Sequence, residues 1–164
     1  RKTAGWLLEQ GGKLTLLVGG ERRPCDSGSE VPKQEFAIVG VKLTSAPKFG
    51  DKDLERLATL RELASLDLAE TAITGTGLKT IARLPSLRQL GLRGAAVQAA
   101  DLAAIQEHAL SDLDLRDTKI ADSSLDALKK LGKVENLWLR KGQLNEDSLS
   151  QLKAALPNCR VRAN

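Results

Sequence analysis

One stretch decides the fold: Leu110-Ser-Asp-Leu113-Asp-Leu115-Arg-Asp-Thr118-Lys-Ile120. Its leucines at positions 1, 4 and 6 and its aliphatic residue at position 11 recur in three further segments, which begin at Leu63, Leu87 and Val134. The second leucine of each copy stands at position 66, 90, 113 or 137, so successive copies are 24, 23 and 24 residues apart. A period of this length indicates units that stack in a row, each burying its apolar side against its neighbours.

The composition suits such a stack. Apolar residues make up 41% of the 164 residues, but the aromatic ones are only two tryptophans and two phenylalanines. Aliphatic side chains must therefore carry the packing. The net charge of +4 comes from 25 basic and 21 acidic residues that are interspersed along the chain. Nucleic-acid binders more often carry a basic stripe with aromatic platforms, so no nucleic-acid partner is expected.

The two cysteines, Cys25 and Cys159, belong to opposite ends of the predicted stack. Neighbouring strands lie about 4.8 Å apart, whereas a disulfide needs Cα atoms within about 7 Å. We therefore predict two unpaired thiols, which do not identify a redox compartment. No run of 18 apolar residues occurs, so this segment is not expected to insert into a membrane. The chain does not begin with Met, and we expect it to be part of a longer protein.

Residues 1–35 do not follow the repeat pattern and are predicted to form an N-terminal cap. Residues 1–12 predict a short amphipathic helix, and residues 13–18 predict a strand that ends in a Gly-Gly turn. Residues 21–34, which include two prolines, predict a loop. Such an end piece would shield the first repeat from water, and Trp6 is a candidate for its lid.

Residues 36–164 are predicted to form an array of about five repeats that ends in a truncated strand. In each repeat, leucines at helical spacing follow the strand, and residues such as Pro85 end the helix. Strand, turn, helix and return bring the next strand alongside. We therefore predict an α/β fold: a short, right-handed solenoid with a parallel β-sheet on the concave face and helices on the convex face.

Position 9 of the frame is occupied by Thr71, Ala95, Thr118 and Gly142. The pattern L-x-x-L-x-L-x-x-T-x-I, completed by helical leucines and a Leu-Pro-x-Leu exit, resembles bacterial leucine-rich repeats of the type abundant in planctomycete proteins. Residues 63–87 and 110–134 carry this resemblance best, although Ala95 and Gly142 depart from it. The resemblance implies a non-catalytic interaction or sensor module, of a kind often attached to serine/threonine kinase-like and other domains.

The outward strand positions are the candidate binding face, because alternate residues of a strand point to opposite sides of the sheet. The candidate residues on this face are Trp138, Arg93, Arg116, Arg140, Asp112, Asp114, Asn136 and Arg162. Trp138 stands between two inward leucines, so it should point outward as a binding hot spot. The alternative is that its ring only covers neighbouring side chains.

Arg93, Arg116 and Arg140 would form a ladder that accepts a carboxylate or phosphate of a partner. The alternative is a solvated face whose charges are compensated by nearby aspartates. No cofactor, metal or catalytic group is expected, because His108 has no Cys/His partners at metal-ligand spacing and no phosphate loop or Gly-x-Ser-x-Gly motif occurs.

The sequence thus favours a protein- or peptide-binding module over an enzyme, and the arginine ladder predicts an acidic partner. Five to six strands give a face of about 400 Å², roughly half of a standard partner footprint. Binding is therefore expected to be weak or directed at a peptide. The alternative function is a structural spacer or dimerisation element that self-associates weakly through the open strand edge at residues 160–162.

Overall fold

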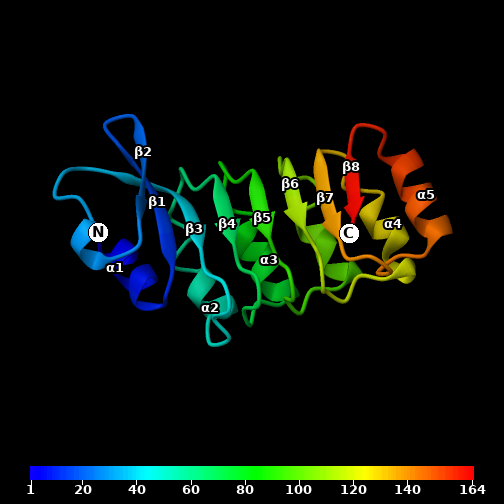
Figure 1. The fold of residues 1–164 in the computed structure, drawn as a ribbon, viewed down its shortest axis with the longest axis horizontal. Helices are drawn as coiled ribbons and strands as arrows, with labels where there is room; N and C mark the ends of the chain where they lie inside the picture. Colours follow the sequence, from blue (N-terminus) through cyan, green and yellow to red (C-terminus); the bar gives the residue numbers. More distant parts are fainter.

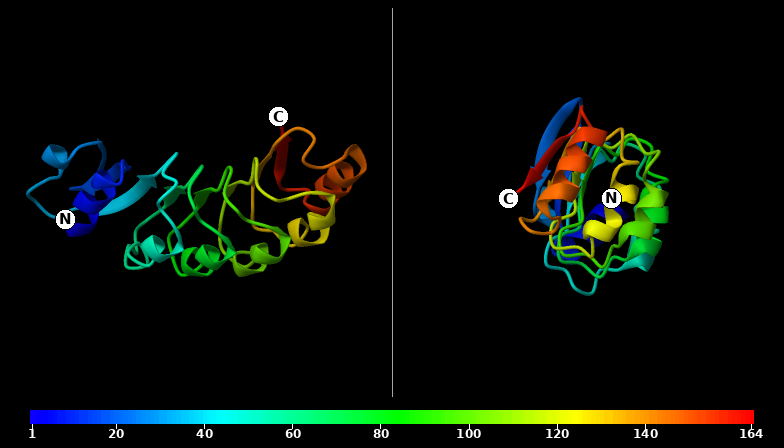
Figure 2. Two further views of the ribbon diagram at one scale, coloured as in Figure 1. Left: turned by 90° about the horizontal axis from the view of Figure 1, so that it is seen from below. Right: turned by 90° about the vertical axis from the view of Figure 1, so that its right-hand side faces the viewer.

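A computed structural model describes residues 1–164 as a row of repeats with strands on one side and helices on the other (Figures 1 and 2). The strands are β1 (Lys13–Val18), β2 (Glu21–Cys25), β3 (Ala37–Lys42), β4 (Ser65–Asp67), β5 (Gln89–Gly91), β6 (Asp112–Asp114), β7 (Asn136–Leu139) and β8 (Arg160–Ala163). They form one eight-stranded sheet in the order β2-β1-β3-β4-β5-β6-β7-β8. Strands β3 to β8 are parallel, and the two at the N-terminal end are antiparallel.

The register of the sheet confirms the repeat frame. Leu66 pairs with Leu90, Leu90 with Leu113, and Leu113 with Leu137. The row continues to Val41 at one end and Val161 at the other. Val41 and the four leucines are at most 3% exposed, and we call this row the leucine core. Each leucine so deeply buried contributes about 1.5–3 kcal/mol relative to an exposed one.

Helical segments cover the inner side of the sheet (Figure 2). The α-helices are α1 (Lys2–Glu9), α2 (Asp51–Leu54), α3 (Gly75–Ile81), α4 (Leu125–Leu128) and α5 (Glu146–Ala155), and the 3-10 turns are η1 (Gly28–Glu30), η2 (Ala99–Ala104) and η3 (Asp122–Ser124). The repeat between β5 and β6 therefore contains no α-helix, but its Leu102 and Ile105 are still buried as their spacing predicts.

The N-terminal end differs from the prediction in one element. Residues 21–25, expected to be loop, form the edge strand β2, which pairs with β1 from Val18↔Glu21 to Leu14↔Cys25. Gly19 and Gly20 both have positive φ, 58° and 87°, as a tight hairpin requires. Pro24 is tolerated because an edge strand does not need every backbone N–H for pairing.

The helix at the N-terminus closes the apolar end of the array. Ala4 and Leu7 of α1 are fully buried. Trp6 is partly buried, with its ring centroid 5.9 Å from that of Phe49 and the Arg56 guanidinium 4.5 Å from its own centroid. A single cluster of 38 buried residues runs from Ala4 to Leu156. The architecture is that of a leucine-rich-repeat solenoid. None of its helices has the length and apolar character needed to cross a bilayer.

Candidate binding face

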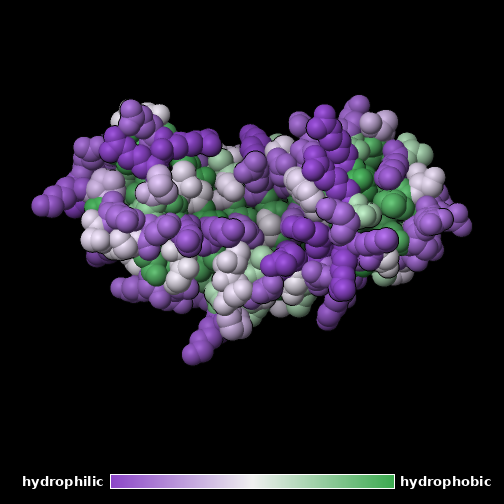
Figure 3. Space-filling model, in the orientation of Figure 1, coloured by the Kyte–Doolittle hydropathy of each residue, from purple (hydrophilic) through white to green (hydrophobic).

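Two outward columns run across the parallel strands, and we call them together the sheet face. The first column contains Gly40, Ser65, Gln89, Asp112, Asn136 and Arg160, and the second contains Lys42, Asp67, Gly91, Asp114, Trp138 and Arg162. This face points toward the viewer in Figures 1 and 3. Hydrophilic residues cover most of it, and a hydrophobic area lies toward its C-terminal end, in the region of β8 and α4 (Figure 3). The sequence-derived columns therefore match the strand register.

A tight turn follows each of the parallel strands β3 to β6. The third row of candidate residues, which is Arg93, Arg116 and Arg140, lies where the strands lead into these turns. The equivalent residues Ser45, Glu70, Gly94 and Asp117 have φ between 56° and 72°, the left-handed region. Three of them are not glycine, so the sequence does not mark this feature. Ala69 occupies the same frame position as Arg93, Arg116 and Arg140, but it is only 5% exposed.

Threonines at frame position 9 satisfy the turn within their own repeat. The hydroxyl of Thr71 donates to the carbonyl of Leu68 at 2.7 Å, and Thr118 donates to Leu115 at 2.6 Å. Where alanine replaces threonine, the Ala95 amide donates to the equivalent Leu92 carbonyl at 3.0 Å. The Thr118 amide also lies 3.4 Å from the Leu115 carbonyl, so the carbonyl at this turn has a partner with or without a hydroxyl, as buried polar groups require.

All three arginines of the predicted ladder are paired with acids of the protein. Arg93 contacts Glu70 at 2.7 Å, and Arg140 contacts Asp117 at 3.1 Å. Both acids occupy the left-handed turn position of the preceding repeat. These pairs are solvent-exposed, so each contributes little to stability, but they reduce the charge that the arginines present to a ligand.

Arg116 is held most firmly of the three. Its Nε lies 2.9 and 3.1 Å from the two oxygens of Asp114, and its Nη2 lies 2.6 Å from Oδ2. The hydrogen bonds that Arg116 donates to Asp114 are the main cause of the raised pKa of Arg116, and the charges of Asp114, Asp117 and Asp67 add to it. The Arg116 guanidinium is thus already bound by a carboxylate of its own repeat.

Asp112 and Asn136 are brought together across two strands. The Asn136 amide donates to Asp112 at 3.1 Å, and the Ser111 hydroxyl donates to the other carboxylate oxygen at 2.6 Å. No cation lies within ion-pair distance of Asp112. Its charge is therefore solvated by neutral donors only, unlike that of Asp114.

Trp138 lies on the sheet face, between the buried Leu137 and Leu139 of β7. It is half-buried and is not among the residues that pack on the core. The Arg162 guanidinium, on the neighbouring strand, is 5.7 Å from the ring centroid, within the range of a cation–π contact. The ring therefore points outward as predicted, but its neighbours cover part of it.

A hollow of about 310 Å³ opens on this face where the second column reaches Gly91. Asp67, Asp112, Asp114, Arg116 and Trp138 are among its lining residues. A Cβ at Gly91 would lie 2.7 Å from Oδ1 of Asp67, so the carboxylate leans over the glycine. The sequence did not predict this hollow. Strand alternation indicates which side of the sheet a residue faces, but it does not indicate the shape of the surface.

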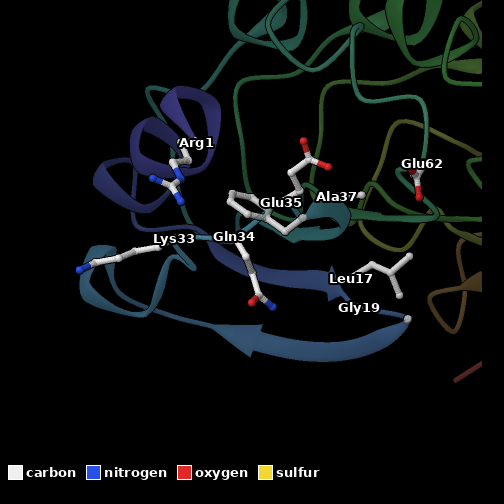
Figure 4. Close-up of a pocket in the computed structure, with 10 residues that line it drawn as sticks. Arg1, Leu17, Gly19, Lys33, Gln34, Glu35, Ala37 and Glu62 are labelled. Atoms are coloured by element: carbon white, nitrogen blue, oxygen red, sulfur yellow. The ribbon is translucent and has the colours of Figure 1, made fainter.

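A larger, open hollow of about 750 Å³ lies at the cap (Figure 4). Figure 4 shows that its polar side chains do not converge: Lys33 extends away from the opening, and Gln34 and Glu35 point in opposite directions. A site needs groups that meet at one point, so the sheet face remains the better candidate.

The histidine and the thiols lie away from the sheet face. Nε2 of His108 is 2.8 Å from the Leu84 carbonyl of the preceding repeat, whereas Nδ1 is buried without a partner. Cys25 and Cys159 are both free, as predicted. Burial is the main cause of the raised pKa of each thiol. The negative charge of Glu30 raises the pKa of Cys25 further. Both cysteines are therefore poor nucleophiles at neutral pH.

Comparison with known proteins gives similarity of fold only. No family model matches the sequence. The chain is similar to a leucine-rich-repeat protein of Leptospira interrogans, with a TM-score of 0.45 and 17% identity over 65% of this chain and 33% of that one. It is also similar to internalin C2 of Listeria monocytogenes, with a TM-score of 0.45 and 15% identity over 76% of this chain and 70% of that one. The match thus spans about a third of the Leptospira chain. The fold assignment itself rests on the strand register and the leucine core.

Proposed function

We propose that the sheet face binds a protein segment or peptide, and that the chain is a non-catalytic interaction module of a longer protein. One observation carries this proposal. Strands β4 to β7 each present a leucine toward the core, whereas the residues that they present toward solvent vary from strand to strand, with Trp138 half-exposed among them. A half-exposed tryptophan surrounded by charged groups is typical of a hot spot.

The C-terminal part of the face is where an acidic group of the partner would bind. Arg160 and Arg162 make no ion pair within the chain, and the Arg140 side chain is 70% exposed beside Asp117. By contrast, Asp114 already neutralises Arg116. We therefore retain the acidic partner of the sequence prediction, but assign its contact to Arg160 and Arg162 rather than to the ladder centred on Arg116.

The test uses the two tryptophans as internal probes, since Trp138 lies on the sheet face and Trp6 in the cap. Peptides selected by phage display on the immobilised protein are titrated into ¹⁵N-labelled protein, and the two indole N–H signals are followed by NMR. The Trp138 signal should shift and that of Trp6 should not. Acidic peptides should bind about tenfold more weakly to Arg162→Glu and normally to Lys153→Glu, a matched change on α5. Selected peptides that shift only Trp6, or none that bind, would contradict the proposal.

A second function, self-association or spacing within a longer chain, is favoured by one feature of the sheet. β8 is the last strand and pairs only with β7, so one of its edges has unpaired backbone groups. An unpaired edge is a template for another strand. Sedimentation equilibrium decides this alternative: a mass that rises with concentration, and that falls back when Val161→Pro blocks the edge, would support it.

A further inference from the structure

The hollow over Gly91 separates two parts of the sheet face with opposite charge. On its C-terminal side lie Arg160 and Arg162. In and around the hollow lie three carboxylates, of Asp67, Asp112 and Asp114, and one guanidinium, of Arg116, which gives a formal charge of −2. The residues that line the hollow therefore carry an excess of negative charge, with Lys42 and Arg162 beside them.

Two of the three carboxylates lack a close cationic partner. Lys42 is the nearest to Asp67, at 3.9 Å, and its side chain is 60% exposed, so it contributes little. Asp112 has only neutral donors, the Ser111 hydroxyl and the Asn136 amide. A cation in the hollow would therefore gain a charge-assisted contact with a carboxylate that has no strong cationic partner in the chain.

Trp138 adds an aromatic wall to the same hollow. Its ring already attracts the Arg162 guanidinium at 5.7 Å, which shows that it can take a cation in this setting. A metal ion does not suit the site, since no three acidic, histidine or cysteine residues converge closely enough to hold one. A flat or extended organic cation fits an aromatic wall with separated carboxylates better than a compact ion does.

We infer that the hollow over Gly91 is a specificity pocket for a basic side chain, arginine above all, of a peptide that lies along the sheet face. The guanidinium would contact the carboxylates of Asp67 and Asp112 and lie against Trp138. Because Gly91 has no side chain, the Asp67 carboxylate can lean over it, and a Cβ there would lie 2.7 Å from Oδ1 of Asp67. This inference rests on the proposed function, because it names the chemistry that one part of the same face selects.

The experiment uses the blocked pentapeptide acetyl-Gly-Gly-Arg-Gly-Gly-amide and its citrulline and glutamate counterparts, titrated into ¹⁵N-labelled protein. Citrulline keeps the shape of arginine without its charge. The arginine peptide should shift the signals of Gly91, Asp67 and the Trp138 indole. The citrulline and glutamate peptides should leave these three signals unmoved.

Variants then assign the contacts. Asp67→Asn and Asp112→Asn should each weaken binding of the arginine peptide about tenfold, whereas Asp126→Asn, a matched loss of one carboxylate on the helical side, should not. Gly91→Val fills the hollow and should abolish binding. Gly132→Ala, where a new methyl meets nothing within 4 Å, is the glycine control. Circular dichroism melts check that each variant is folded.

The outcomes separate this inference from the function on which it rests. The inference is overturned if citrulline binds as well as arginine, or if folded Gly91→Val binds the arginine peptide normally. If peptides from the display selection still shift Trp138 in that case, the sheet face remains a binding face with a different selectivity. If no peptide of any class moves its signals, the proposed function fails as well.

Discussion

The two sides of the same strands follow different rules. Toward the helices, Leu66, Leu90, Leu113 and Leu137 occupy one row and are at most 2% exposed. Toward solvent, their neighbours Ser65, Gln89, Asp112 and Asn136 share neither charge nor shape. The repeated side creates the fold, because each coil needs the same shape to stack on the next. The varied side is free to carry recognition, so substitutions on the two sides should have very different consequences.

The largest effect is expected from Leu113→Asp. It would bury an unpaired carboxylate in the leucine core and remove a fully buried side chain, at a cost of about 4 kcal/mol or more. We expect the cooperative urea unfolding transition, followed by circular dichroism, to be lost or shifted far to lower urea. The same new residue on the outward side, Ser65→Asp, should change the free energy of unfolding by less than about 0.5 kcal/mol. Equal stability of the two variants would refute the distinction between the sides.

The leucine core could be predicted from sequence because its signal is periodic. Val41 pairs with Leu66 at an offset of 25, close to the steps of 24, 23 and 24 between the other copies, and the outward positions then follow from alternation. By contrast, the turn acids Glu70 and Asp117 pair with arginines one repeat ahead. That pairing depends on a left-handed backbone conformation that sequence does not reveal at a residue other than glycine.

The remaining misses have the same origin, since each depends on tertiary context. Strand β2 contains Pro24 and mostly polar residues, and it is a strand only because β1 offers it an edge. At the hollow over Gly91, the Asp67 carboxylate leans over the glycine, and its position depends on a rotamer rather than on the sequence pattern. Periodicity therefore yields the scaffold, whereas the depth and charge balance of the site need coordinates.

An intermediate effect is expected from Gly77→Ala, which sharpens the comparison by testing how tightly two repeats meet behind the sheet. The new methyl would lie 2.5 Å from Oδ1 of Asp51 and 2.8 Å from Cδ1 of Leu54. Asp51 also accepts the Thr74 amide at 2.9 Å, so it cannot move without loosening that bond. Overpacking of this kind costs about 1–3 kcal/mol.

The matched control is Gly5→Ala in α1, where a methyl would meet nothing within 4 Å. There the substitution should stabilise by up to about 1 kcal/mol, because alanine favours helix over glycine. Thermal unfolding of both variants should therefore show shifts of opposite sign. A shift in the same direction for both would mean that the contact between α2 and α3 is looser than the distances indicate.

The smallest effect is expected where neighbouring repeats touch through exposed polar groups, at Glu55. The Thr80 hydroxyl donates to Glu55 at 2.7 Å, and Arg83 lies 2.6 Å from the other oxygen. These hydrogen bonds, that of Thr80 first, lower the pKa of Glu55 in the folded chain.

A lowered pKa stabilises the folded chain at pH values above the unfolded pKa, which is about 4.3. This stabilisation is lost as the pH falls through the pKa of the folded chain. Urea midpoints of the parent should therefore exceed those of Glu55→Gln slightly at pH 7, and the gap should narrow as the pH is lowered below the unfolded value. Glu62→Gln, which removes an exposed carboxylate without a hydrogen-bond partner, should show no gap at either pH. If Glu55→Gln were as damaging as Gly77→Ala, polar contacts on the outside would hold the repeats together as strongly as the packing behind the sheet does.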